Sequence, residues 1–69
     1  MRIFDNDPDE YGNQIILARP LTASEEKQIE RFSCDYECEY YQGAFERAWI
    51  NVDLKDAEPL MNYLIALPN

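Results

Sequence analysis

The sequence predicts a two-layer α+β sandwich, in which two helices cover one face of a small, mostly antiparallel sheet in the order β-β-α-β-β-α. Three features predict it: apolar runs of strand length, a helix-capping signature between them, and an apolar helical face near the C-terminus. The 69 residues fit one domain, residues 1–69. Because 46% of them are hydrophobic, the chain is too apolar to be disordered.

The first third of the chain predicts two strands joined by a turn. Residues 1–4 form a short strand, and residues 5–13 form a turn because Pro8, Gly12 and Asn13 break regular structure. Residues 14–19 (QIILAR) are a β-branched apolar run, which is typical of a central strand covered on both faces. Pro20 ends it.

A helix follows, and its start is marked by a capping box. Thr22 is the predicted N-cap, with Glu25 reaching back to its backbone. The helix is expected to end at about residue 32 or 33. Its apolar stripe is narrow, with Ala23, Ile29 and Phe32, so one face contacts the core and the rest faces solvent.

Residues 36–42 and 44–52 predict a β-hairpin around Gly43. A two-residue loop would place Glu39 opposite Glu46, and like charges in that position are destabilising. We therefore expect an odd loop, such as a three-residue turn with Gly43 in the left-handed region. One face then holds Tyr36, Cys38, Tyr40, Ala48, Ile50 and Val52. The other holds Glu37, Glu39, Tyr41, Phe45, Arg47 and Trp49.

A second helix is expected near the C-terminus, capped by Asp53 or Asp56 and stopped by Pro68. Pro59 is tolerated in its first turn. Four side chains make one broad apolar face that we expect to pack on the core: Leu60, Met61, Leu64 and Ile65.

The charge pattern predicts a basic partner. Fourteen acidic and six basic side chains give a formal net charge of −8. They are concentrated: residues 1–13 hold four acidic side chains and one basic, and residues 24–39 hold six and two. Nucleic acid and anionic membranes would repel this surface. A basic protein would be attracted to it.

Catalysis and cofactor binding are not expected. The chain has no histidine, and its two glycines leave no glycine-rich phosphate loop. No serine has a nucleophile-elbow context. A domain of this size also has difficulty enclosing a water-excluded pocket. We therefore expect a non-enzymatic protein without a cofactor.

Two short patterns resemble metal sites and are incomplete. Asp5-x-Asp7-x-Asp9 imitates the start of a calcium loop, but Glu10 stands at the required glycine and Ile16 at the bidentate glutamate. Cys34 and Cys38 lack the two further ligands of a structural zinc. We expect no metal. We expect both cysteines to be reduced and structural in a soluble, cytoplasmic protein without a secretory leader or membrane span.

The predicted contact surface is the outer face of the hairpin. Glu37 and Glu39 would hold their carboxylates ~6.6 Å apart, close to the spacing of phosphates on a nucleic-acid strand. Tyr41, Phe45 and Trp49 share this face. The alternatives are that other elements bury these rings as core, or that the face forms a homodimer. Together the candidate partner-binding residues are Asp5, Asp7, Asp9, Glu10, Glu26, Glu30, Glu37, Glu39, Tyr41, Phe45 and Trp49.

In size, charge and expected compartment, the chain resembles the small acidic inhibitors of phages and mobile elements, including anti-CRISPR proteins and other DNA mimics. The resemblance covers overall character only, so it assigns no residues. It implies a stoichiometric inhibitor that occupies the nucleic-acid site of a basic host complex. Two alternatives remain open: an antitoxin or immunity-type protein that neutralises a basic nuclease, and a homo-oligomeric accessory protein. A small enzyme or metal carrier ranks last.

Overall fold

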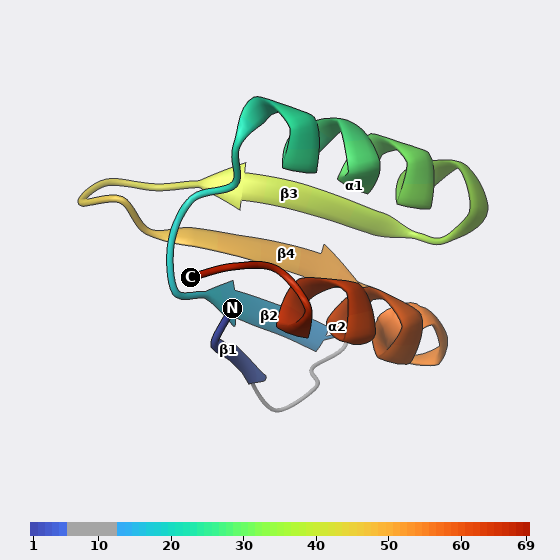
Figure 1. Ribbon diagram of the computed structural model, residues 1–69. Helices are drawn as coiled ribbons and strands as arrows, with labels where there is room; N and C mark the ends of the chain where they lie inside the picture. The colour runs from blue at the N-terminus through green and yellow to red at the C-terminus, as the bar shows by residue number, and fades with distance from the viewer. Residues whose placement is uncertain (6–12) are drawn as a thin grey trace.

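The computed structural model describes residues 1–5 and 13–69, and it confirms the predicted α+β class and element order (Figure 1). The described strands are β1 (Ile3–Asp5), β2 (Asn13–Leu17), β3 (Cys38–Gln42) and β4 (Ala48–Val52). The described helices are α1 (Ala23–Asp35) and α2 (Ala57–Ile65), with a 3₁₀ turn η1 (Leu54–Asp56) before α2. Within these residues no helix is long and apolar enough to cross a membrane.

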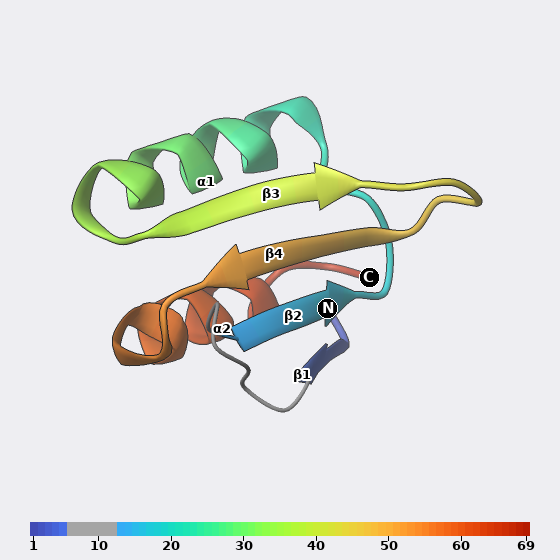
Figure 2. The same ribbon diagram turned by 180° about the vertical axis from the view of Figure 1, so that it is seen from behind.

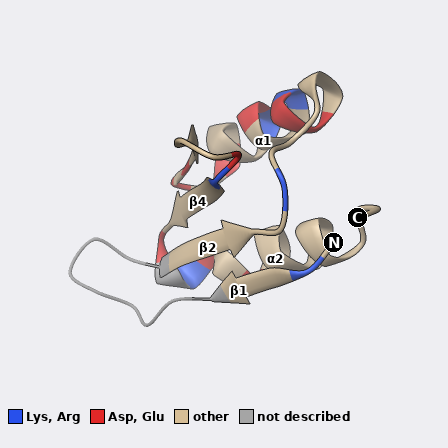
Figure 3. Ribbon diagram, turned by 90° about the vertical axis from the view of Figure 1, so that its left-hand side faces the viewer, with Lys and Arg blue, Asp and Glu red and all other residues tan. Residues whose placement is uncertain are grey.

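The four strands form one antiparallel sheet in the order β1-β2-β4-β3, so β2 is central as predicted and β1 and β3 are the edges. Both helices lie on the same side of this sheet (Figure 3). From behind, the strands stand in front of α2, and no described helix covers this face (Figure 2). We call it the open face.

The core lies between the sheet and the helices. Alternate strand residues supply one side of it, among them Ile15, Ile50 and Val52, and α2 supplies Leu60 and Leu64 from the other side. The prediction that β2 is covered on both faces is wrong. Ile16 is 37% exposed because both helices pack on the other side of the sheet.

Helix α1 begins with the predicted capping box. Thr22 accepts a hydrogen bond from the Glu25 backbone, and the Glu25 carboxylate accepts one from the Thr22 backbone. The helix continues to Asp35, two to three residues further than expected. Ala23 is exposed, so its place in the apolar stripe is corrected, whereas Ile29 is buried.

The β3–β4 hairpin has the predicted parity but a different turn. Cys38 pairs with Val52 in the register that places them together on the core face. Five residues, 43–47, separate the strands. In this turn Phe45 and Glu46 have positive φ, 58° and 60°, whereas Gly43 does not lie in the left-handed region. Such a pair is characteristic of a tight two-residue turn.

A β-bulge restores the odd parity. The Arg47 carbonyl accepts from the Gly43 backbone, and the Arg47 N–H donates to the Ala44 carbonyl. Gly43 and Ala44 therefore lie together opposite one residue, as in a bulge. Because of the extra residue, Glu39 lies opposite Asn51 and the predicted repulsion with Glu46 is avoided.

Helix α2 confirms only part of its predicted core face. Leu60 and Leu64 are buried, but Ile65 is 57% exposed. Five residues turn a helix by about 500°, so Ile65 points roughly 140° away from Leu60. Asp56 is the N-cap by position, although its side chain accepts from the Glu37 backbone and makes no capping bond.

Candidate partner-binding surface

One row of apolar and aromatic side chains crosses the whole open face. In the strand register Phe4 lies beside Ile16, Ile16 beside Trp49, and Trp49 beside Tyr41. Phe4 is 55% exposed and Tyr41 39%, while Trp49 is half-buried. We call these four residues the open-face row. Contiguous apolar groups in contact with water are typical of interaction surfaces.

At its β3 end, the open-face row is held in place by the packing of Trp49 against its neighbours. The rings of Tyr41 and Trp49 stack with centroids 5.8 Å apart and an interplanar angle of 18°. Trp49 also lies over Gly43: a β-carbon placed there would be 3.0 Å from its Cζ3 atom. The Tyr41 hydroxyl donates to the Glu39 carboxylate, and this bond is the main reason that the pKa of Tyr41 is raised.

Charges of opposite sign border the row. On one side Glu39 lies beside Asn51 of β4. On the other side, Arg2 places its guanidinium carbon 5.9 Å from the centre of the Phe4 ring. Arg47 lines a shallow hollow on the open face together with Trp49. Glu46 lines the same hollow as Arg47. The open face therefore carries charges of both signs, with Glu39 at its β3 edge.

The carboxylates gather where α1 meets β3. A groove runs between α1 and β3. It is lined by every residue of β3 and by one stripe of α1, namely Glu26, Ile29, Glu30 and Ser33. We call it the α1–β3 groove. It includes Tyr41, so the groove and the open-face row meet at that side chain. In Figures 1 and 2, α1 runs alongside β3 over most of its length.

A second hollow extends the acidic region toward the start of β3. Glu37 and Asp53 line it, and it shares Ser33, Cys38 and Glu39 with the α1–β3 groove. Glu26, Glu30, Glu37 and Glu39 therefore follow one side of the molecule, which we call the acidic edge. None of the four makes an ion pair among the described interactions.

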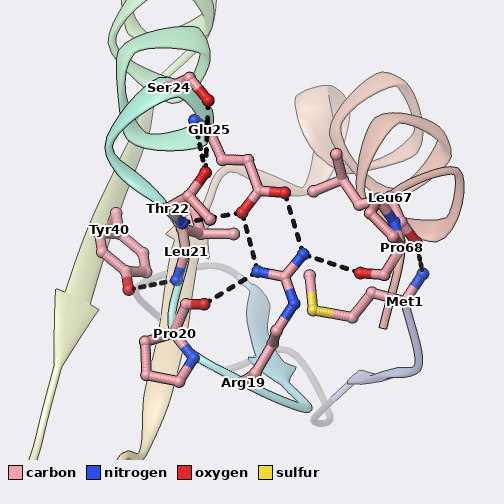
Figure 4. Close-up of polar contacts among 10 residues, drawn as sticks. All are labelled: Met1, Arg19, Pro20, Leu21, Thr22, Ser24, Glu25, Tyr40, Leu67 and Pro68. Carbon is pink, nitrogen blue, oxygen red and sulfur yellow. Dashed lines mark hydrogen bonds and ion pairs between the residues drawn. The ribbon is translucent and has the colours of Figure 1, made fainter.

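A different charged pair is structural. The Arg19 guanidinium donates to both Glu25 oxygens, at 2.8 and 2.9 Å, and to the carbonyls of Pro20 and Pro68 at 2.9 and 2.7 Å (Figure 4). The Arg19 bond and the Thr22 backbone bond lower the pKa of Glu25 from 4.5 to about 2. This clamp joins the start of α1 to the C-terminal segment, and its charges are already paired.

The predicted site residues fall into three groups. Glu26, Glu30, Glu37, Glu39 and Tyr41 come together at the acidic edge, and Trp49 stacks on Tyr41. Phe45 is separate: it lies at the hairpin tip and is 94% exposed. The side chain of Asp5 and all of Asp7, Asp9 and Glu10 lie outside the described residues, as does the calcium-like pattern that they form.

The alternative that the hairpin rings are core is wrong for Tyr41 and Phe45. Sequence reasoning missed Phe4 and Ile16. The available signal was their alternation with Ile3, which is partly buried, and Ile15, which is buried, but the apolar run QIILAR hid it.

The two cysteines differ. Both are free thiols, and Cys38 is buried with its pKa raised by that burial. Cys34 is exposed, so the expectation that it is structural is corrected. Among the described residues no three His, Cys, Asp or Glu side chains are grouped to hold a metal ion.

No family model, curated protein or solved structure matches the chain.

Proposed function

We propose that the protein is a non-catalytic inhibitor that binds a basic nucleic-acid-binding protein or complex and blocks its nucleic-acid site. The supporting observation is the acidic edge, where four carboxylates that make no ion pair with a described residue adjoin the exposed ring of Tyr41 and the half-buried ring of Trp49. This arrangement combines the two parts that such a contact needs, charge to attract the partner and aromatic groups to anchor it.

The carboxylates take the place of phosphates. Lys and Arg side chains that hold nucleic-acid phosphates would pair with Glu26, Glu30, Glu37 or Glu39 instead. With a net charge of −8, the protein would also be steered toward a positive groove, which raises the association rate at low salt. Charge reversal at Glu37 and Glu39 should therefore slow association and flatten its salt dependence.

Phe45 provides a second line of support. Its φ of 58° is unfavourable for a residue with a side chain, and its ring is 94% exposed. Neither the turn nor the core benefits from phenylalanine here, which is consistent with selection for contact with a partner. Phe45→Asn should stabilise the hairpin, by about 0.5–1 kcal/mol, and weaken partner binding.

The test begins with capture of a partner from host-cell lysate on the immobilised protein and its identification by mass spectrometry. Binding of the purified pair is then measured at low and high salt, with nucleic acid as competitor. Trp49→Ala should raise the dissociation rate, at a cost of about 2 kcal/mol. Glu58→Lys, on α2, is the control for charge reversal. Affinity indifferent to salt, to Glu37 and Glu39, and to nucleic acid would refute the mechanism.

An antitoxin or immunity-type protein would use the same surface against a basic nuclease, and the identity of the captured partner distinguishes the two. The open-face row specifically favours a second function, a homo-oligomeric accessory protein, because two such faces could pack together. Sedimentation would then give a dimer that Ile16→Glu dissociates, while Glu39→Gln leaves it intact.

A further inference from the structure

At the α1–β3 groove, the outer edge of β3 carries backbone hydrogen-bonding groups that no other described strand pairs with. Glu37 accepts from the Asp53 backbone, and Gly43 donates to Arg47. Antiparallel ladders alternate, so between these two pairs residues 39 and 41 also bond toward β4. The alternate residues are Cys38, Tyr40 and Gln42. Their backbone N–H and C=O groups point away from β4, toward the outer edge of the sheet. No described element pairs with this edge.

The wall of the groove carries charges at a spacing that suits a strand. Glu26 and Glu30 are four residues apart on α1, which is a rise of about 6 Å along the helix. Side chains two residues apart on one face of a strand are separated by about 6.8 Å. In Figure 1, α1 runs alongside β3. A strand that paired with the outer edge of β3 would therefore bring its own alternate side chains, those on the α1 side, near the carboxylates of Glu26 and Glu30.

We infer that the α1–β3 groove binds an extended segment of the basic partner, which adds to β3 as a further antiparallel strand and presents lysine or arginine at alternate positions to Glu26 and Glu30. The intervening side chains lie toward Glu39 and Tyr41 on the open face. The inference rests on the proposed function, whose partner it describes in more detail. Strand addition of this kind takes its affinity from the backbone and its specificity from alternate side chains.

The same charges oppose pairing of β3 with a second copy of this chain. Two β3 edges brought together would juxtapose Glu26, Glu30 and Glu39 with their own counterparts. Charged side chains beside an edge strand are a common protection against such self-association. A basic segment meets attraction at the same positions, so the groove distinguishes it from a copy of the protein itself.

The test uses a synthetic peptide in which lysine and valine alternate, and the intact protein. Affinity is measured by calorimetry, and amide shifts of Cys38, Tyr40 and Gln42 by NMR. Two peptides carry backbone N-methyl groups, one on the lysines and one on the valines. In the proposed antiparallel pair, the peptide residues whose side chains lie on the same face as Tyr40 are the lysines, and their backbone groups form the hydrogen bonds to Cys38, Tyr40 and Gln42. Methylation of the lysines should therefore lower affinity about tenfold or more, and methylation of the valines should have little effect.

Variants of the protein test the same edge. Gln42→Pro removes an outward N–H without removing a bond to β4, so peptide affinity should fall several-fold while Gln42→Thr retains it. Glu26→Gln with Glu30→Gln should weaken binding about tenfold, and Glu58→Gln should not.

The outcomes separate the two proposals. Binding that depends on the glutamates but responds equally to both N-methylated peptides overturns strand addition and leaves the acidic contact in place. Peptide binding that is indifferent to Glu26 and Glu30, or absent altogether, also overturns strand addition, whereas the proposed function fails only if the captured partner binds without regard to salt, to Glu37 and Glu39, and to nucleic acid. Self-association that involves the β3 amides and excludes the peptide also overturns the inference.

Discussion

The Arg19–Glu25 clamp predicts a specific dependence of stability on pH. Glu25 is 9% exposed, and its pKa is lowered from 4.5 to about 2, first by the hydrogen bond from Arg19 and then by that from Thr22. A group whose pKa is lower in the folded state stabilises that state above its unfolded pKa. The contribution is therefore fully present above about pH 5 and is lost as the pH falls from about 4.5 toward 2.

The magnitude follows from this lowered pKa. Each unit of pKa corresponds to about 1.36 kcal/mol, so the lowering of the Glu25 pKa corresponds to about 3 kcal/mol of folding free energy. Because the Arg19 side chain is 25% exposed, solvent screens the pair and reduces this contribution to about 2 kcal/mol. Glu25→Gln retains an amide oxygen for the Thr22 N–H but loses the ion pair. It should cost about 2 kcal/mol at pH 7, a large fraction of the stability of so small a chain.

Urea unfolding, followed by Trp49 fluorescence, measures this cost across the range from pH 7 to pH 2. The difference between wild type and Glu25→Gln should shrink as the pH falls and should nearly vanish at the acidic end. Glu58→Gln, which removes an exposed charge from α2, should differ from wild type by less than about 0.5 kcal/mol throughout. A Glu25→Gln deficit that is the same at every pH, or is absent at pH 7, would refute the clamp.

Three further predictions concern packing and reactivity. Leu64→Ala should cost about 2–5 kcal/mol in urea unfolding, because this residue is fully buried, and an unchanged midpoint would show that α2 is not packed as described. Gly43→Ala should displace the Trp49 ring and change its fluorescence while the protein remains folded; an unaltered spectrum would contradict their contact. In the native protein Cys34 should react with a thiol reagent, and Cys38 should react only on unfolding; equal rates would argue against the burial of Cys38.

The features that the sequence predicted well are those with a local physical cause. The capping box depends on Thr22 and Glu25, three residues apart, so it was visible in the chain. The parity of the hairpin followed from avoiding Glu39 opposite Glu46. Its turn could not be predicted, because Phe45 and Glu46 adopt positive φ against their own preference and Gly43 serves the bulge and the Trp49 ring instead.

The features that were missed depend on tertiary structure. An unbroken apolar run does not reveal how many sheet faces are covered, so Ile16 was assigned to the interior. The importance of Arg19 appears only when the chain turns back to bring Glu25 and Pro68 to it. The sequence predicted which residues form the acidic edge but not that they lie together on one surface. Only the packing of α1 against β3 places Glu26 and Glu30 beside Glu39.

The most direct test of the proposed function is competition for the nucleic-acid site of the captured partner. Fluorescently labelled nucleic acid is bound to the partner, and its anisotropy is followed as the protein is added. Wild-type protein should displace the nucleic acid stoichiometrically, and the folded variant with glutamine at Glu26, Glu30 and Glu39 should require at least about tenfold more protein. A stable ternary complex of partner, nucleic acid and protein, or equal displacement by the glutamine variant, would contradict inhibition through the acidic edge.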